Sequence, residues 1–310
     1  MKIFHGYNLN NIRGDFFGGL TAAVVALPLA LAFGVASGLG PLPGLYGAII
    51  VGFFAALFGG TPTQITGPTG PMTVVVASIF LYFDKNIEIV FFIISLSGLI
   101  QIFIGFSTLG KYVKRIPASV VTGFMSGIGI IIISLQIPVL LGLGSKGDVL
   151  TSLTSLQNIA DFKIDSLIVG VIGLFFVIFF PKKIDSYLPR PIIALIVGSI
   201  LASLYFNNQA LIGYIPSGIP SFSIYIPKLV ELPEILYFSV MLASLGIIDS
   251  LLTSVVADNM TKSNHLPNKE SIGQGIGNII SGFFGGLAGA GATMRTVVNI
   301  QSGGKTPYSG

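Results

Sequence analysis

Long apolar runs separated by short polar turns dominate the chain. A helix needs roughly 20 mostly apolar residues to cross a bilayer, so these runs predict membrane-spanning helices. The predicted spans cover residues 14–37, 43–60, 68–83, 88–109, 117–142, 164–181, 190–206, 234–258 and 270–287, and a tenth opens near 292 and continues to the end of the sequence. The third and tenth spans are short, and each follows a stretch rich in Gly, Pro and Thr.

Composition supports a membrane protein. Hydrophobic residues make up 52% of the 310 residues, and charged residues make up 9%, against about 25% in an average soluble domain. The chain has no cysteine, which excludes disulfides and thiolate metal sites. Its net charge of +4 is scattered rather than gathered into a basic block, which argues against nucleic acid as a partner. The lipid bilayer is therefore the first expected partner.

The Lys and Arg residues between the spans predict the orientation, because cytoplasmic loops are enriched in them. A cytoplasmic N-terminus places eleven of them inside: Lys2, Arg13, Lys111, Lys114, Arg115, Lys182, Lys183, Arg190, Lys262, Lys269 and Lys305. It places four outside: Lys85, Lys146, Lys163 and Lys228. Arg295 falls within a span and is assigned to neither side. The imbalance predicts ten crossings, with both short spans counted.

Small residues recur at every fourth position in the second and ninth spans. They are Gly44, Ala48, Gly52, Ala56 and Gly60 in the second, and Gly273, Gly277, Ser281 and Gly285 in the ninth. Such ladders let helix backbones approach closely. Each ladder runs into Phe-Gly-Gly, then a short irregular segment, then Thr-Val-Val at residues 73–75 and 296–298. Glycine-rich helices resemble one another by composition alone, but matched features in the same order favour a duplication.

Aligning the two copies pairs Thr69 with Ala292, Gly70 with Thr293 and Met72 with Arg295. The third and tenth spans are an odd number of crossings apart, so the two copies have opposite orientations in the membrane. The sequence therefore predicts an inverted repeat, which is a common architecture of transporters.

The Gly-rich segments 67–71 and 289–293 interrupt the two short spans at membrane depth. Two broken helices would then present their N-termini to each other near the midplane, where N–H groups and positive dipole ends attract an anion. The alternative is a pair of plain loops at the membrane surface. The orientation count disfavours it, because that count needs both short spans.

Asp249 lies near the middle of the eighth span, whereas the other carboxylates fall at span ends or in loops. A charge at the bilayer centre costs at least ~2.5–3.5 kcal/mol and marks a functional hypothesis. Thr253 lies one helical turn later on the same face. Together with backbone carbonyls of the broken segment, these oxygens suit Na⁺. A proton carried by Asp249, or a buried ion pair between Asp249 and Arg295, are the alternatives.

Three further side chains are worth noting. Arg295 is the one basic residue inside a span, and it adds to the field that attracts an anion. Phe33 follows Pro28, a predicted kink, and either lines a substrate cavity or simply packs. His265 lies in a polar inner loop, where we expect it to be solvated.

Several strings closely resemble the SulP family of anion transporters. They are Gly14 to Ala22 (GDFFGGLTA), Gly44 to Gly47 (GLYG), Ile248 to Thr253 (IDSLLT), Val256 to Asp258 (VAD), and Asn268 to Glu270 (NKE) through Gly277-Asn278. Within that family, Gly67 to Thr73 (GPTGPMT) and Gly289 to Met294 (GAGATM) are most similar to the cyanobacterial sodium-dependent bicarbonate transporters. The resemblance covers nearly the whole chain.

The resemblance implies an all-α polytopic membrane protein with a seven-plus-seven inverted-repeat fold, of which about ten of fourteen spans are present. Spans 3 and 10 would be half-helices that meet at the midplane. Residues 1–110 and 230–310 would form core spans 1–4 and 8–10, and residues 111–210 would form gate spans 5–7. The later spans and a STAS domain would be absent, so the chain is expected to be incomplete.

The resemblance also implies the site residues. The anion would be held by Thr69, Gly70, Ala292 and Thr293, with Phe33 at an aromatic position of the family and Arg295 nearby. Na⁺, the coupling ion, would be held by Asp249, Thr253, Gly291 and Thr293. No other cofactor is expected. Arg295 departs from the bicarbonate branch, where a small residue is expected, and keeps sulfate open.

We therefore expect a secondary anion transporter of the bacterial plasma membrane, with a Na⁺-coupled bicarbonate symport as the first hypothesis. A sulfate transporter coupled to Na⁺ or H⁺, and an uncoupled anion channel or exchanger in which Arg295 alone supplies positive charge, are the alternatives. An enzyme is not expected, because no metal-ligand pair or activated nucleophile is visible in the sequence. A homodimer is left open.

Overall fold

The computed structural model describes residues 11–107, 118–143, 149–157, 162–181, 190–205, 222 and 225–310. The chain divides into two compact units, one combining Met1–Val121 with Ile215–Gly310 and the other formed by Thr122–Tyr214. The assignment of the predicted core and gate to such units stays a prediction. Seven basic residues used in the orientation count lie outside the described residues: Lys2, Lys111, Lys114, Arg115, Lys146, Lys182 and Lys183.

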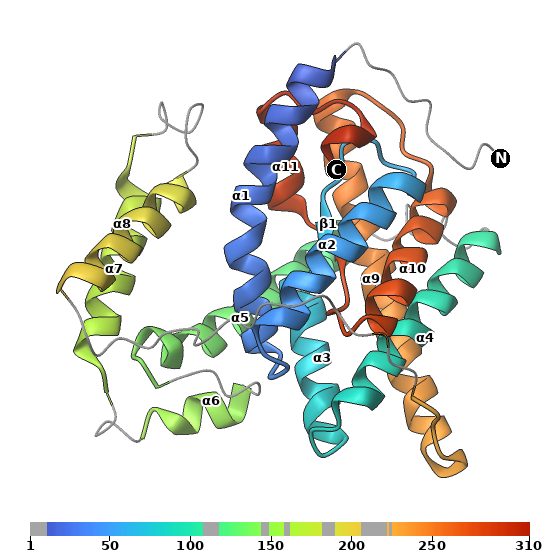
Figure 1. Cartoon of the computed structure of the whole chain (residues 1–310), viewed down its shortest axis with the longest axis horizontal. Coiled ribbons are helices and arrows are strands. Elements are labelled where there is room, and N and C mark those ends of the chain that lie inside the picture. Colours follow the sequence, from blue (N-terminus) through green and yellow to red (C-terminus); the bar gives the residue numbers. More distant parts are fainter. Residues whose placement is uncertain are drawn as a thin grey trace. The chain divides into compact units, whose positions relative to one another are not determined.

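The first unit holds two runs of elements, labelled in Figure 1. The first run is α1 (Ile12–Ala36), α2 (Pro41–Phe58), β1 (Thr66–Gly67), α3 (Gly70–Tyr82) and α4 (Ile87–Phe106). The second is a 3₁₀ turn (Leu229–Glu231), α9 (Leu232–Thr261), α10 (Pro267–Phe283), β2 (Ala290–Gly291), α11 (Thr293–Gln301) and a last 3₁₀ turn (Pro307–Ser309). Between them come α5 (Ala118–Leu140), which crosses into the second unit, α6 (Val149–Ser155), α7 (Ile164–Phe179) and α8 (Arg190–Tyr205).

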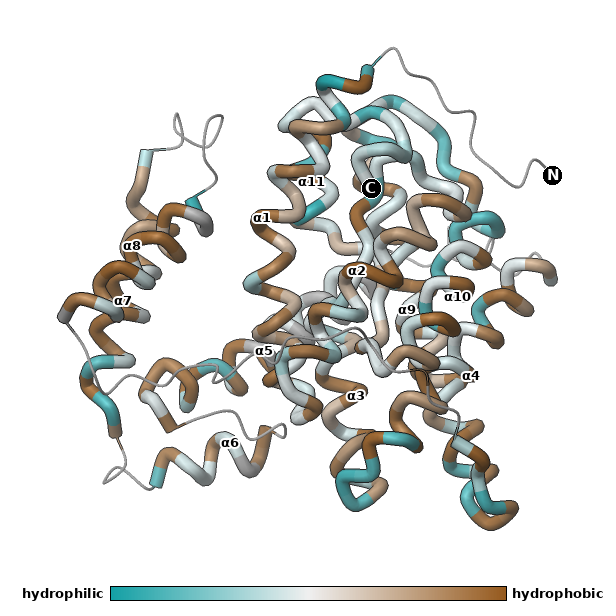
Figure 2. Tube along the Cα trace, viewed as in Figure 1, coloured by the Kyte–Doolittle hydropathy of each residue, from teal (hydrophilic) through white to brown (hydrophobic). Residues whose placement is uncertain are grey.

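A described helix lies at each of the ten predicted spans. Four helical stretches among the described residues are long and apolar enough to cross a membrane: Ile12–Ala36, Pro41–Phe58, Ile87–Phe106 and Leu229–Thr261. Figure 2 shows the apolar character of α7 and α8, and α7 has no buried residue, as suits a helix that faces lipid. The chain is a multi-pass membrane protein.

Two details of the prediction are wrong. The short helix α6 was not predicted, and the tenth span does not continue to the end of the sequence, because α11 ends at Gln301. Gly303 adopts a φ of 104°, which is open mainly to glycine and turns the chain. Pro307 then begins a 3₁₀ turn that Thr306 caps through its side chain.

The small-residue ladders bring the helices of the first unit into close contact. A Cβ at Gly44 would fall on the carbonyl oxygen of Ala30 in α1, and one at Gly273 would fall on the backbone of Gly59 at the end of α2. On the other side of α10, a Cβ at Gly275 would lie 2.5 Å from the carbonyl oxygen of Gly98 in α4. The ladders therefore pack backbone against backbone, as small-xxx-small patterns predict.

The two broken segments meet as a short antiparallel strand pair. Thr66 pairs with Gly291, and Gly67 pairs with Ala290. The half-helices α3 and α11 run away from this pair in opposite directions (Figure 1). The helices begin at Gly70 and Thr293, the two residues that the repeat alignment matches. Pro71 lies in the first turn of α3, where a missing N–H costs no hydrogen bond.

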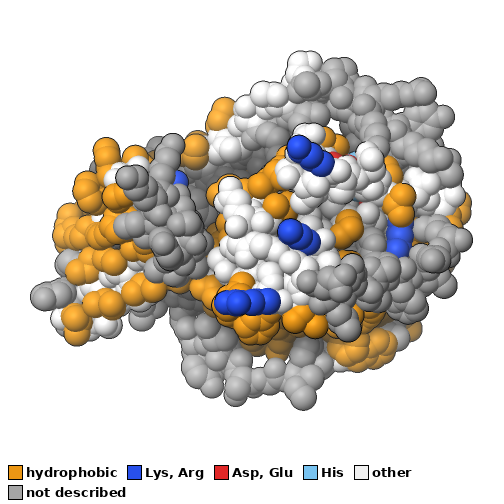
Figure 3. Space-filling view, turned by 90° about the horizontal axis from the view of Figure 1, so that it is seen from above, with side chains coloured by type: hydrophobic (Ala, Val, Ile, Leu, Met, Phe, Trp, Pro, Cys, Tyr) orange, Lys and Arg blue, Asp and Glu red, His pale blue; other side chains and the backbone are white. Residues whose placement is uncertain are grey.

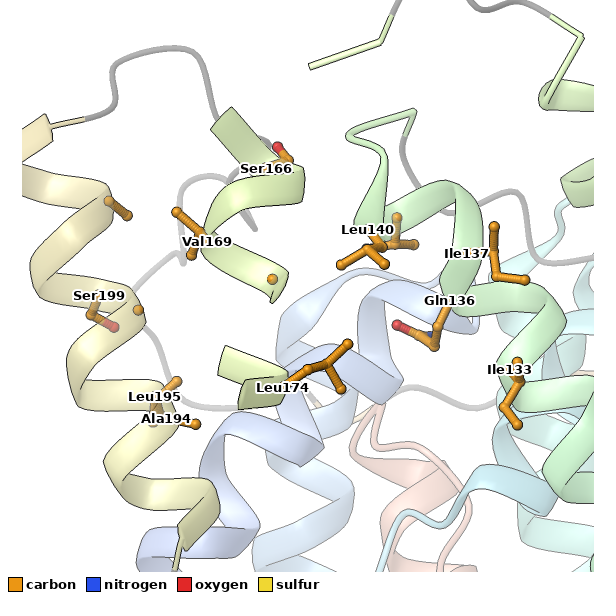
Figure 4. A pocket seen from close by; sticks show the side chains of 14 residues that line it. Ile133, Gln136, Ile137, Leu140, Ser166, Val169, Leu174, Ala194, Leu195 and Ser199 are labelled. Atoms are coloured by element: carbon orange, nitrogen blue, oxygen red, sulfur yellow. The ribbon is translucent and has the colours of Figure 1, made fainter. Parts of the chain in front are cut away.

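In the second unit, α5, α7 and α8 line a cavity of about 670 Å³ (Figure 4). Its lining is mostly aliphatic, with Ile137, Leu140 and Leu174 among the side chains shown. Gln136, Ser166 and Ser199 are the polar side chains in this lining, and none of the lining residues is charged. The cavity therefore offers little for an ion, and the charged candidates all lie in the first unit.

Candidate ion-binding site

Asp249 connects α9 to the start of the first half-helix. It lies well inside α9 and is 4% exposed. Its Oδ2 accepts a hydrogen bond of 2.8 Å from Oγ1 of Thr69, the residue that precedes α3. A buried carboxylate needs such partners, because leaving it unpaired is costly. The structure therefore brings the predicted cation residue and the predicted anion residue into direct contact.

Thr253 makes the matching connection to the second broken segment. Its Oγ1 donates to the carbonyl oxygen of Gly291 at 3.0 Å and lies 2.8 Å from Oγ1 of Thr293. Because a hydroxyl carries one proton, Thr293 donates in the second contact when Thr253 donates in the first. The side chains of Asp249 and Thr253, one turn apart, thus face the starts of both half-helices. Oxygen atoms gather here, as a hard cation requires.

The helix starts themselves are suited to an anion. Thr69 and Ala292 precede α3 and α11, and neither caps its helix with a side-chain hydrogen bond. The side chain of Thr69 is turned to Asp249 instead. The first N–H groups of a helix attract negative charge. The geometry thus brings the predicted anion residues Thr69, Gly70, Ala292 and Thr293 to the two half-helix starts, although their binding role stays a prediction.

Arg295 lies in the first turn of α11 and is 3% exposed. Its Nη2 donates to the carbonyl oxygen of Pro68, and its Nη1 has no hydrogen-bond partner. The guanidinium also packs against Gly67, where an added Cβ would lie 2.9 Å from Nη1. It lines a cavity of about 450 Å³ that α1 and α2 border.

The alternative of a buried ion pair between Asp249 and Arg295 is not observed. No nitrogen–oxygen pair of these residues lies within 4.0 Å. The Asp249 carboxylate is bonded to Thr69, while the guanidinium donates across the strand pair to Pro68. A cation so buried still contributes positive charge to the region between the half-helices, because screening by water is weak there.

Phe33 lies near the end of α1 and is half-buried. It packs against an apolar cluster that includes Met72 and Val76 of α3 and Leu39. The packing alternative considered from the sequence is therefore observed, and a contact of Phe33 with an anion stays a prediction.

Two other carboxylates, which the sequence places at span ends, are also buried. Glu270 is 2% exposed and Asp15 is 1% exposed. Asp15 accepts hydrogen bonds from the backbone N–H of Lys305 at 2.7 Å and of Thr306 at 2.9 Å, which ties the segment after α11 to α1. Both carboxylates lie near helix ends in the sequence, yet neighbouring segments fold over them.

His265 corrects another expectation, because it is buried rather than solvated, at 4% exposed. Its Nδ1 lies 2.6 Å from Oδ2 of Asp258, and its backbone N–H donates to the same oxygen at 3.0 Å. Asp258 thereby closes the turn between α9 and α10. This contact is structural and lies away from Asp249.

A polar stripe on α10 was missed from the sequence. Glu270, Gln274 and Asn278 follow one another at intervals of four and are all buried. Their spacing on a membrane helix was the signal that could have revealed them, because residues four apart share one face. Their contacts run to both broken segments, and they therefore belong to the structure of the site.

Exposed basic residues gather at one end of the first unit. Arg13 lies in the first turn of α1, Lys262 follows α9 and Lys305 follows α11, and all three are exposed. These segments lie at the upper end of the unit in Figure 1, and Figure 3 views that face, where Lys and Arg side chains stand out. Lys85 follows the end of α3, Lys228 precedes the start of α9, and both residues are exposed. Lys228 thus lies at the opposite end of α9 from Lys262.

Comparison with known proteins decides the family, because residues 12–310 match the sulfate permease family. The chain belongs to this family. It is 48% identical to the bicarbonate transporter BicA of Picosynechococcus sp. and 46% identical to BicA of Synechocystis sp., and each match covers 100% of the chain and 57% of the relative. It is 34% identical to the putative sulfate transporter YvdB of Bacillus subtilis, with 99% of the chain and 59% of that protein covered. The chain thus spans less than two thirds of the length of these relatives.

Solved structures of the family agree with the fold. The transmembrane domain of a cyanobacterial bicarbonate transporter BicA matches with a TM-score of 0.91 and 46% identity, over 99% of this chain and 81% of that one. SLC26A9 matches with a TM-score of 0.82 at 19% identity, over 98% of this chain and 52% of that one, which bears on the fold alone. The predicted SulP membership and the seven-plus-seven inverted-repeat fold are confirmed.

Proposed function

We propose that this sulfate permease family chain contributes to a secondary anion transporter that moves bicarbonate together with Na⁺ by alternating access. The main observation behind this proposal is the double contact of α9, in which Asp249 meets Thr69 and Thr253 meets Gly291 and Thr293. One helix thereby connects the starts of both half-helices. The names of the BicA relatives favour bicarbonate as the substrate.

In this proposal Na⁺ is held by the carboxylate of Asp249, the hydroxyls of Thr253 and Thr293, and the carbonyl of Gly291. The anion is held at the starts of α3 and α11 by backbone N–H groups and by the Thr69 hydroxyl. The cation offsets the charge of Asp249, which would otherwise repel the anion. Each ion then favours binding of the other, and this coupling is reciprocal in free energy.

Alternating access needs two bodies that move relative to each other. We assign the unit that contains the ion residues to the core and Thr122–Tyr214 to the gate. The protein would lie in the bacterial plasma membrane with a cytoplasmic N-terminus. The exposed residues Arg13, Lys262 and Lys305 support this orientation, because basic residues favour the cytoplasmic side.

Sulfate is the second candidate, and Arg295 is the observation that favours it. Its guanidinium is buried beside the strand pair and has one nitrogen without a partner. A divalent anion interacts about twice as strongly as a monovalent one with a given charge at a given distance. A buried arginine therefore suits sulfate more than it suits bicarbonate.

Uptake of radiolabelled bicarbonate and radiolabelled sulfate into proteoliposomes, each with and without an inward Na⁺ gradient, tests the proposed function. We expect accumulation of bicarbonate that depends on the gradient and weak uptake of sulfate. Gradient-driven sulfate uptake with no bicarbonate uptake would identify the second candidate instead. Steady anion currents that do not depend on Na⁺ would overturn coupled transport.

Replacing Arg295 with Gly is expected to raise the KM for the transported anion by about tenfold, because a single favourable charge interaction of about 1.4 kcal/mol is lost. If sulfate is carried at all, its KM should rise more than that of bicarbonate. Uptake measured over a range of anion concentrations checks this. The control is Arg13→Gly, which removes an exposed arginine at the start of α1. An unchanged KM for both anions in Arg295→Gly would show that Arg295 does not act on the anion.

A further inference from the structure

The polar stripe on α10 holds the backbone on both sides of the strand pair. Asn278 donates through Nδ2 to the carbonyl oxygen of Gly289 at 3.0 Å and accepts from the N–H of the same residue at 2.8 Å. Gln274 donates through Nε2 to Oγ1 of Thr66 in β1 at 2.9 Å. Side chains on one face of α10 therefore hold the backbone just before β2 and the Thr66 side chain of β1.

Glu270, at the start of the stripe, accepts hydrogen bonds from Gly60, Gln64 and Gln274. Its Oε2 accepts from the N–H of Gly60 at 2.8 Å. Its Oε1 accepts from Nε2 of Gln64 at 2.9 Å and from Nε2 of Gln274 at 2.7 Å. Every one of these partners is a donor, so the arrangement requires a group that only accepts, and an ionised carboxylate is such a group.

Gln64 carries this arrangement to the ion site. Its Nε2 points to Glu270, and its Oε1 accepts from Oγ of Ser254 in α9 at 2.9 Å. Because Nε2 faces a carboxylate, the amide cannot turn over without losing the bond to Glu270 and placing two acceptors against each other. Its Nε2 lies directly against Gly291, where an added Cβ would overlap it.

Gly291 is the residue whose carbonyl accepts from Thr253. Its N–H is held as well, by Oγ of Ser250 at 3.0 Å. The Gln64 amide thus forms one wall of the pocket in which the Gly291 backbone sits. Glu270 touches none of the predicted ion residues, yet it decides how this wall is oriented.

We infer that Glu270 is a positioning residue for the cation site, acting through Gln64 to hold the Gly291 carbonyl where it binds Na⁺. The inference rests on the proposed function, because it takes Na⁺ as the ligand of that carbonyl. The sequence patterns did not associate Glu270 with either ion. The inference gives this buried carboxylate of α10 a specific role.

Glu270→Gln is the sharpest substitution, because it keeps the shape and changes only the hydrogen-bond pattern. If its carbonyl oxygen faces Gly60, its NH₂ group meets the NH₂ groups of Gln64 and Gln274. If the amide turns over, its NH₂ group meets the N–H of Gly60. Either way one donor faces another donor. In the first arrangement Gln64 loses its acceptor and is expected to leave its place beside Gly291. In the second, the clash with Gly60 displaces the new side chain and with it the acceptor of Gln64.

The double variant Glu270→Gln with Gln64→Glu should restore a consistent pattern. The new amide accepts from Gly60 and donates to the carboxylate at position 64, whose second oxygen accepts from Ser254. Gln274 can turn its Oε1, which has no hydrogen-bond partner, towards the new amide. The double variant keeps one buried carboxylate in the same hydrogen-bond network. Restored Na⁺ binding would therefore come from the pattern of donors and acceptors and not from a change in net charge.

The test measures binding of ²²Na⁺ to the purified chain in detergent, together with the rise in Tm on adding NaCl, so no transport step is needed. Glu270→Gln is expected to weaken Na⁺ binding about tenfold, and the double variant is expected to return within about threefold of the unsubstituted chain. Binding of bicarbonate at saturating Na⁺ should change less than binding of Na⁺. Glu88→Gln, at an exposed position of α4, is the matched control and should bind Na⁺ normally.

Ser254→Ala covers the case in which Glu270→Gln fails to fold. It removes the hydroxyl that holds Oε1 of Gln64 and should weaken Na⁺ binding in the same direction by a smaller factor. Normal Na⁺ binding by Glu270→Gln or by Ser254→Ala, or equal weakening in the single and double Glu270 variants, would overturn the inference. Absence of Na⁺ binding in the unsubstituted chain would instead overturn the proposed coupling to Na⁺.

Discussion

Asp249→Asn should abolish the dependence of anion uptake on Na⁺ and lower uptake under a Na⁺ gradient by at least about tenfold. The substitution keeps the size of the side chain and an oxygen that can accept from Thr69. It removes the negative charge that attracts the cation, so the free energy of the Na⁺ gradient no longer drives accumulation of the anion. Uptake of radiolabelled bicarbonate into proteoliposomes, measured against the Na⁺ concentration inside and outside, provides the measurement.

Glu88→Gln is the matched control, since it removes a carboxylate from an exposed position at the start of α4. It should leave Na⁺-dependent uptake unchanged. Retention of Na⁺-stimulated uptake by Asp249→Asn would rule out Asp249 as the cation ligand. Loss of Na⁺ dependence together with normal gradient-free uptake would separate coupling from anion binding and would strengthen the assignment.

Gly44→Ala should destabilise the first unit more than any ordinary surface substitution does. A Cβ at this position would fall on the carbonyl oxygen of Ala30, with the N–H of Gly34 also close. These are backbone atoms, so no side-chain rotation relieves the clash, and α1 must move away from α2. Overpacking of this kind costs about 1–3 kcal/mol or more. Thermal unfolding in detergent should show a lowered Tm.

Gly173→Ala tests whether the cost comes from packing rather than from the loss of a glycine. Gly173 lies in α7, and an added Cβ there would meet nothing within 4 Å. Alanine is the better helix former by roughly 0.5–1 kcal/mol, so this variant should be unchanged or slightly stabilised. Equal Tm values for Gly44→Ala and Gly173→Ala would mean that the α1–α2 contact tolerates a methyl group.

The repeat alignment and the positions of Gly and Pro located the half-helices correctly, because both report local properties of the backbone. The repeat alignment matched Gly70 with Thr293, and these are the first residues of α3 and α11. Glycine and proline mark breaks wherever the chain places them, since their effect on the backbone does not depend on distant contacts. Asp249 was equally visible, because a carboxylate in the middle of an apolar run has no local explanation.

Burial at the helix ends was harder to predict. Glu270 was placed at the start of the ninth span with no indication of burial, and the polar neighbours of His265 suggested a solvated loop. In the structure, Gly60 and Gln64 cover Glu270, and Asp258 pairs with His265. These partners come from other turns or other helices, so no local pattern could show them. The orientation of Arg295 is a similar case, because its partner is the carbonyl oxygen of Pro68, which carries no side-chain signal.

The sequence by itself determined that the chain lies in a membrane, that it contains two matched broken helices, and that Asp249 and Arg295 are the unusual charges within the spans. Only the tertiary structure decided which atoms these charges face. It brought Asp249 to Thr69, directed Arg295 to Pro68, and placed a buried carboxylate of α10 behind the strand pair. The physical reason is that hydropathy and backbone preference are properties of single residues and their neighbours, whereas a hydrogen bond to a distant segment exists only once the close-packed glycine ladders have brought the helices together.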